Sequence, residues 1–276
     1  MRLGSFLLGL AVPLAAAVPA RAQLLAEITP VKYSLTARPG VPVARDIQIA
    51  NRGDAPVVVR VRYSDWALTE RGDLSLEPSG STPNSLAGMV EFEPREFSLQ
   101  AGESGHIRVT VSLPGVGPAT RWGVLLSEVR LADPGGSRFG PRAVAELGTT
   151  LYLSRAPAGL VRADVTGMDV LPLGNDSISV SVRIRNAGDR HFYVAGEIAL
   201  ADSNGSPVRA GRFGTGVVLP GGVRNFTWTC DGGLMPGRYL ATATLDTGEP
   251  ELMVGEAWFL WPVPGPGPPP LAQSQR

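Results

Sequence analysis

The sequence predicts an all-β protein made of two immunoglobulin-like β-sandwich domains in tandem. Three observations support this fold class. First, runs such as Val43–Ala50 and Ile178–Arg185 alternate apolar and polar residues and end at turn residues, as half-buried strands do. Second, 34 Gly and 25 Pro accompany 43% hydrophobic residues, which favours many short strands around a packed core. Third, a strand followed by an Asn-X-Gly-Asp turn occurs twice, at Ile49–Asp54 and Ile184–Asp189, which indicates a duplicated fold.

The two ends of the chain are expected to lie outside the sandwiches. Residues 1–22 have the features of a secretory signal peptide: Arg2 at the start, an apolar Phe6–Pro19 and the small-residue site Ala20-Arg21-Ala22. No later apolar run approaches the ~20 residues of a membrane-spanning helix, so we expect a mature chain without a membrane span, in the periplasm. The proline-rich tail, residues 263–276, cannot pair in a sheet and is expected to be an extended end.

The first domain, residues 23–155, is expected to contain about seven strands, the number in a constant-type immunoglobulin sandwich. The polar stretch Thr69–Leu86 is interpreted as a loop because it is rich in Gly, Ser and Pro. The extended runs that predict the strands are Leu24–Leu35, Val43–Ala50, Val57–Leu68, Val90–Glu93, Phe97–Leu99, Ile107–Val111, Trp122–Val129 and Arg142–Arg155.

The second domain, residues 160–262, follows a linker at Ala156–Gly159. Strands are expected at Ile178–Arg185 and Val223–Thr229, in a run ending near Asp246, and at Trp258–Trp261. The segment Pro236-Gly237-Arg238-Tyr239 resembles the tyrosine corner of immunoglobulin-like domains, in which a tyrosine hydroxyl bonds to backbone just upstream.

Composition argues against several functions. A formal net charge of zero disfavours a nucleic-acid partner or a polybasic membrane contact. The single cysteine, Cys230, can form no intrachain disulfide and is expected to be a small apolar group. The two histidines, His106 and His191, lie in separate predicted domains, and no catalytic or metal-binding motif is present, so we expect neither enzyme activity nor a cofactor.

Residues between Val90 and Glu128 carry a resemblance to a known family. The pattern consists of Phe92, Pro94, Phe97, Leu99, Gly102, Arg108-Val109, Trp122 and Glu128. In this order the segment resembles the first domain of the periplasmic pilus-assembly chaperones (PapD-like). The likeness extends from Leu25 to about Leu131, and the second domain shares only the general character of a sandwich.

This resemblance implies a chaperone that donates an edge strand to a pilus or surface-fibre subunit, without ATP. The donor would be the last strand of the first domain, with predicted contacts at Val144, Leu147, Leu151, Tyr152 and Leu153. The family holds the subunit's terminal carboxylate with two basic residues. Lys32 matches one of them, and Arg155 is the nearest substitute for the other. An outer-membrane usher would be a further partner, and the free chain is expected to be a monomer.

The donor strand departs from the family, because Glu146 and Gly148 interrupt one of its faces and it lacks the family's lysine. A secreted or surface binding module therefore remains the alternative. The tripeptide Arg-Gly-Asp occurs twice, at Arg52-Gly53-Asp54 and Arg71-Gly72-Asp73, and could mediate adhesion from an exposed loop. Ordinary turn chemistry explains both copies as well. The two readings place the binding surface at a strand edge or at loops.

Overall fold

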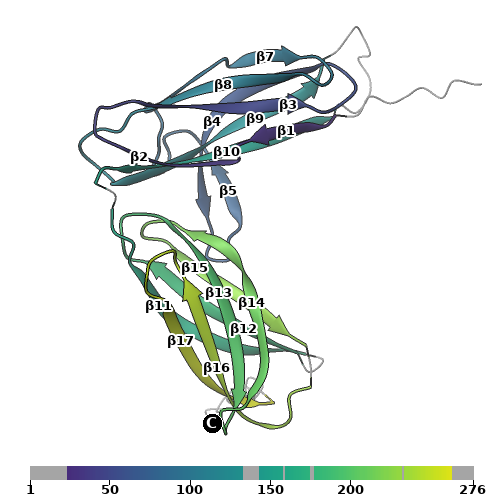
Figure 1. The fold of residues 1–276 in the computed structure, drawn as a ribbon, viewed down its shortest axis with the longest axis vertical. Coiled ribbons are helices and arrows are strands. Elements are labelled where there is room, and N and C mark those ends of the chain that lie inside the picture. The colour runs from purple at the N-terminus through teal and green to yellow at the C-terminus, as the bar shows by residue number, and fades with distance from the viewer. Residues whose placement is uncertain (1–23, 133–142, 158, 175–176, 232, 263–276) are drawn as a thin grey trace, which may run out of the picture.

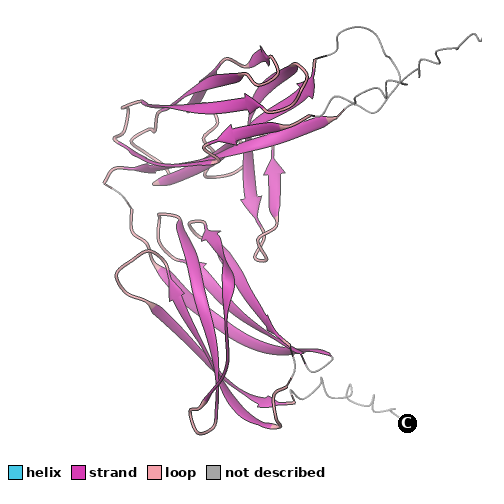
Figure 2. Cartoon of the chain, turned by 45° about the vertical axis from the view of Figure 1, so that its right-hand side comes forward, coloured by secondary structure: helices cyan, strands magenta, loops and turns pink. Residues whose placement is uncertain are grey.

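The chain folds entirely into strands and turns within the part that the structure describes (Figure 2). The computed structural model describes residues 24–132, 143–157, 159–174, 177–231 and 233–262. The expected signal peptide and the proline-rich tail lie outside this part. No helix of the described residues has the length and hydropathy needed to cross a bilayer.

Ten strands of the described residues form the first sandwich. They are β1 (Ala26–Thr29), β2 (Lys32–Ala37), β3 (Val43–Asn51), β4 (Val57–Leu68), β5 (Leu74–Glu77), β6 (Val90–Glu93), β7 (Glu96–Leu99), β8 (Ser104–Val111), β9 (Thr120–Leu131) and β10 (Val144–Arg155). One sheet has the order β1-β3-β8-β6, and the other has the order β2-β10-β9-β4-β5, with β7 paired to β4. Alternate residues of both sheets, such as Ile47, Ile107 and Leu125, fill one core between them.

The second sandwich repeats this architecture with seven strands. They are β11 (Ala163–Gly174), β12 (Ser177–Asn186), β13 (Phe192–Asp202), β14 (Pro207–Val218), β15 (Val223–Cys230), β16 (Gly237–Asp246) and β17 (Met253–Trp261). Its sheets have the orders β11-β12-β15 and β14-β13-β16-β17. The side chains of Ile178, Val182 and Leu200 belong to a separate core, and Cys230 is buried in it. The all-β prediction of two immunoglobulin-like sandwiches is confirmed.

The repeated turn has the same hydrogen bonds in both sandwiches. Asn51 and Asn186 are completely buried. The Nδ2 of Asn51 donates to Gln100 O in the loop before β8, and that of Asn186 donates to Val218 O at the end of β14. In the first matching pair, Asn51 Nδ2 donates to Ala55 O (2.8 Å) and Asn186 Nδ2 donates to Arg190 O (2.9 Å). In the second, Gly53 N donates to Asn51 Oδ1 (3.0 Å) and Gly188 N donates to Asn186 Oδ1 (2.9 Å). In the third, Gly102 N donates to Asn51 O and Gly221 N donates to Asn186 O (both 3.0 Å). The duplicated sequence pattern therefore reflects a duplicated local structure.

Other sequence predictions are corrected by the structure. The run Leu24–Leu35 is not one strand: it divides at Pro30 into β1 and β2, which belong to different sheets. The predicted loop Thr69–Leu86 contains β5, so the first sandwich has more strands than expected. The last strand begins at Met253 and not at Trp258. The predicted tyrosine corner is confirmed, since the hydroxyl of Tyr239 donates to Met235 O at 2.7 Å.

A hairpin formed by β4 and β5 leaves the first sandwich and reaches the second (Figures 1 and 2). At its tip, the N–H of Asn225 donates to Glu70 O at 2.7 Å. Trp66, on the hairpin, shares an apolar cluster with Trp122 of β9 and Leu219, which follows β14. The two sandwiches are thus in direct contact through buried side chains.

Candidate functional site

The predicted donor strand, β10, is paired along its whole length on one side and along only half on the other. Antiparallel pairing with β9 runs from Val144 to Ser154 without a register shift. Parallel pairing with β2 begins only at Thr150, opposite Lys32. Among the described residues, no strand pairs with the second edge of β10 from Val144 to Thr149.

The direction of the backbone groups at this edge follows from one hydrogen bond. The N–H of Thr150 donates to Val31 O at 3.0 Å, so it points toward β2. Every second residue of a regular strand directs its N–H and C=O to the same side. Val144, Glu146 and Gly148 therefore present their backbone donors and acceptors at the unpaired half of the edge.

The side chains of β10 divide between two environments. Leu147, Leu151 and Leu153 face the core of the first sandwich, and the last two are completely buried there. Val144 lies near the start of the strand and is 53% exposed, whereas Tyr152 is 3% exposed and faces the second sandwich. Of the five predicted donor residues, Val144 is thus the one with an exposed side chain in this structure.

The structure does not bring together the two basic residues predicted to hold a carboxylate. Lys32 lies opposite Thr150 at the start of β2, and Arg155 lies opposite Ala37 at its other end. Five residues of a strand span about 17 Å. Arg155 donates to the backbone of its own sandwich, from Nη1 to Gly115 O at 2.9 Å.

Lys32 instead contacts one ring of the second sandwich, that of Tyr193. Its ammonium lies 3.9 Å from the ring centroid of Tyr193, in cation–π geometry. The neighbouring His191 stacks on Tyr152, with centroids 4.2 Å apart and planes inclined by 16°. The Nε2 of His191 also lies 3.4 Å from Ser34 Oγ. Residues from β2, β10 and the start of β13 therefore form one interdomain contact.

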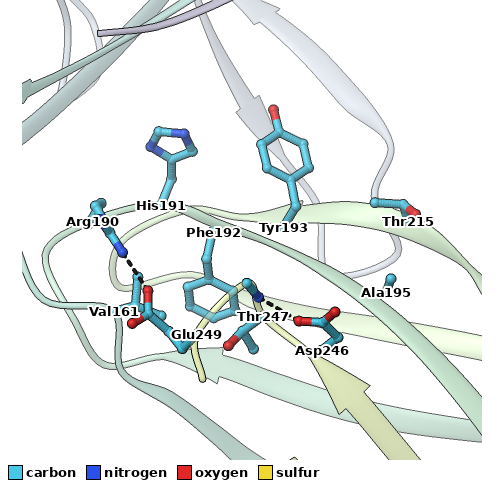
Figure 3. Close-up of a pocket in the computed structure, with 11 residues that line it drawn as sticks. Val161, Arg190, His191, Phe192, Tyr193, Ala195, Thr215, Asp246, Thr247 and Glu249 are labelled. Carbon is cyan, nitrogen blue, oxygen red and sulfur yellow. Dashed lines mark hydrogen bonds and ion pairs between the residues drawn. The ribbon is translucent and has the colours of Figure 1, made fainter. Parts of the chain in front are cut away.

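The alternation of β13 produces this arrangement. His191 and Tyr193 project from one side of the chain, and Phe192 projects from the other (Figure 3). Phe192 is buried in the core of the second sandwich, which leaves its two neighbours directed toward the first. Sequence reasoning missed both residues, although the alternation around Phe192 could have placed them on an outer face.

Burial changes the protonation of two of these groups. The pKa of His191 is lowered to about 4, first by loss of hydration and then by the charges of Lys32 and Arg190. The pKa of Tyr152 is raised, mainly by burial, with a further contribution from its hydrogen bond to Tyr193. Both side chains are therefore neutral near pH 7.

A hollow of about 400 Å³ lies beside this contact on the second sandwich (Figure 3). Its charged residues are already engaged: Arg190 pairs with Glu249 at 2.5 Å, and Asp246 accepts the N–H of Gly248 at 2.7 Å. In the described ranges, no three His, Cys, Asp or Glu side chains are grouped so that they could hold a metal ion. The hollow thus offers no chemistry typical of a catalytic site.

The two Arg-Gly-Asp segments differ in their surroundings. Arg52 of the first pairs with Glu27 at 2.9 Å on the surface of the first sandwich. Gly72 of the second lies at the hairpin tip, next to the guanidinium of Arg224 in the second sandwich. The second copy is therefore part of the interdomain contact.

Comparisons with known proteins give similar structures only. No family model and no curated protein matches the sequence. A chaperone–tip adhesin complex of CFA/I fimbriae biogenesis has 12% identity and a TM-score of 0.44, over 84% of this chain and 98% of that one. The CsuC–CsuE chaperone–tip subunit complex of Acinetobacter baumannii has 14% identity and a TM-score of 0.42, over 84% and 97%. The E. coli chaperone DraB has 16% identity and a TM-score of 0.40, over 85% and 98%.

All three similar structures contain a chaperone, and the first two belong to CFA/I fimbriae biogenesis and to Csu pili. At such identities and TM-scores, the likeness carries no argument about function. The features of this chain that bear on its function are its own strand edge and its interdomain contact.

Proposed function

We propose that the protein is a periplasmic chaperone-like protein that binds pilus or surface-fibre subunits by adding the edge of β10 to them. The observation that carries this proposal is the unpaired half-edge of β10, where Val144, Glu146 and Gly148 present backbone donors and acceptors. An exposed edge of this kind is a template for another strand and is otherwise an aggregation hazard. Main-chain hydrogen bonds would supply the affinity for a subunit that lacks a strand.

Strand addition needs no cofactor and no nucleotide. The driving force is β-pairing together with burial of the apolar surface that the incomplete subunit exposes. We propose Lys32 as the anchor for a subunit carboxylate, because its ammonium lies at the interdomain contact, within 3.9 Å of the Tyr193 ring centroid. Arg155 lies at the far end of β2 and would act separately from Lys32.

The experiment blocks the edge at one backbone atom. Glu146→Pro removes an outward N–H at an edge position, where proline is tolerated. Glu146→Ala is the matched control, because both variants lose the ion pair of Glu146 with Arg62 (2.7 Å) but only proline loses the donor. Each variant is tagged and co-expressed with the small secreted proteins encoded beside its gene, alongside Lys32→Ala.

Strand addition predicts that a stoichiometric partner purifies with the wild type and with Glu146→Ala and is lost with Glu146→Pro. Lys32→Ala is expected to reduce recovery without changing the fold. Equal capture by the alanine and proline variants would exclude the β10 edge as the binding surface. A partner retained fully by Lys32→Ala would exclude only the anchor.

A further inference from the structure

His191 is partly buried between the two sandwiches, and one of its ring nitrogens has no partner in the described structure. Its ring stacks on Tyr152 of the first sandwich, and its Nε2 lies 3.4 Å from Ser34 Oγ. The Nδ1 atom is inaccessible to solvent and makes no hydrogen bond within the described structure. A neutral imidazole tolerates this environment when Nδ1 is the unprotonated nitrogen, because only an acceptor is then left unpaired.

The charged groups around His191 disfavour a positive imidazolium. Lys32 approaches from β2, and its ammonium and the Arg190 guanidinium both act on the imidazole as positive charges. Arg190 is neutralised in part by Glu249, which lies on the far side of it. Tyr152, which stacks on the ring, contributes no negative charge near neutral pH, because burial raises its pKa.

We propose that His191 is a proton-dependent latch between the two sandwiches: the neutral ring holds the contact closed, and its protonation loosens it. A protonated ring would add an unpaired donor at Nδ1 and a second cation beside Lys32 inside the contact. Opening restores water to both nitrogens. This inference rests on the interdomain geometry alone and does not depend on the proposed function.

The direction of the pH effect follows from linkage. In the closed contact the pKa of His191 is about 4, and in an open one it returns toward the ordinary value of 6.5. Above pH 6.5 both states hold a neutral ring, so His191 adds no pH dependence. As the pH falls from 6.5 toward 4, the open state binds the proton first, and the closed contact loses stability.

Linkage is reciprocal, which supplies the decisive test. With only two histidines in the chain, the ring signals of His191 and His106 can be followed separately by NMR titration. Leu219→Ser loosens the interdomain cluster without adding a charge. We expect this variant to move the titration midpoint of His191 from about 4 toward 6.5.

The distance between the sandwiches gives the second readout. Spin labels are placed on exposed sites, at Glu91→Cys and Asn204→Cys, in a Cys230→Ala background. We expect the distance distribution to broaden as the pH is lowered from above 6.5 toward 4. His191→Phe, which keeps a stacked ring but cannot take a proton, should abolish the change, and His106→Gln should preserve it.

Two results would overturn the latch. The first is a Leu219→Ser variant in which the spin-label distances broaden, so that the contact has opened, while the titration midpoint of His191 stays the same as in the wild type. The other is a pH-dependent broadening that persists in His191→Phe and in His191→Gln. Using two replacements separates the loss of a proton site from damage to the contact.

Discussion

Asp65 is a carboxylate enclosed in the first sandwich, and four donors hold it there. Oδ1 accepts the hydroxyls of Tyr63 (2.7 Å) and Ser85 (2.6 Å), and Oδ2 accepts the N–H and hydroxyl of Thr82 (3.0 and 3.1 Å). Burial by itself would raise the pKa of Asp65, but the hydrogen bonds from Ser85, Tyr63 and Thr82 outweigh it, and the pKa is lowered. The ionised form is therefore the one that the fold stabilises.

Replacing Asp65 with Asn should destabilise the first sandwich by about 1–3 kcal/mol, because the amide nitrogen leaves two buried donors without an acceptor. The lowered pKa of Asp65 adds stability that is present above pH 3.8 and is lost as the pH falls through the folded-state value. Asp65→Asn should remove this part of the acid sensitivity. Urea unfolding at neutral and acidic pH measures both effects. Asp46→Asn, at an exposed ion pair with Arg108, is the control and should be nearly neutral.

Asn51 and Asn186 perform the same task in their two sandwiches, so the same substitutions should have the same effects. Each directs its amide N–H groups at backbone carbonyls and accepts one N–H at Oδ1. Aspartate at either position would set carboxylate oxygens against carbonyl oxygens in a buried site. We expect Asn→Asp to cost more than Asn→Ala, which itself should cost roughly 1–3 kcal/mol. If thermal unfolding shows the same loss of stability for Asn→Asp and Asn→Ala, the hydrogen bonds of the asparagine side chains do not stabilise the turns in this way.

At the scale of elements, the β4–β5 hairpin connects the sandwiches, and Gly72 at its tip tests that connection. A Cβ at Gly72 would collide with the guanidinium of Arg224, and the backbone there has a φ of +95°. Gly72→Ala should displace Arg224 and weaken the interdomain contact. Gly80→Ala is a matched control, since its φ is +84° and its nearest neighbour would lie at an ordinary 3.7 Å.

Both glycine variants should lose about 1 kcal/mol or more of stability from the strained backbone. Only Gly72→Ala should also broaden the distance between spin labels on the two sandwiches. If both variants leave that distance unchanged, the hairpin tip does not hold the sandwiches together.

The strands that could be predicted from the sequence are those with one face buried in a core and the other face more exposed. Val43–Asn51 and Ser177–Asn186 bury alternate residues in a core, so their alternation is regular. β5 was missed because Leu74 and Leu76 are exposed and its partner is the projecting end of β4. The division at Pro30 was missed because β1 and β2 have the same alternating pattern, and alternation does not tell which sheet a strand joins.

At the scale of the whole molecule, the sequence could place Lys32 on a first strand but could not show what it faces. Its partner Tyr193 lies in the other sandwich, and alternation identifies an outer face without identifying the domain that approaches it. The same holds for His191 and Tyr152, which are far apart in sequence and stack only because the sandwiches meet. The unpaired half of β10 likewise depends on where β2 begins, which the undivided run Leu24–Leu35 concealed.

The contact between the sandwiches should couple their unfolding, because each has its own core and they share one further apolar cluster. Leu219 of the second sandwich is 8% exposed and packs in this cluster against aromatic residues of the first. Leu219→Ser removes buried apolar surface and should cost roughly 2–5 kcal/mol, by analogy with other truncations of buried leucine. Part of that cost belongs to the coupling, so calorimetry should show both unfolding transitions at lower temperatures than in the wild type.

Leu160→Ser is the control for this experiment, because Leu160 is 77% exposed in the segment that joins the sandwiches. It should leave both transitions in place. If Leu219→Ser lowers the unfolding temperature of the second sandwich and leaves that of the first unchanged, the shared cluster stabilises only the second sandwich and does not couple the two. If both transitions move, the interdomain contact is an energetic part of the fold, and it holds His191 against Tyr152 of β10.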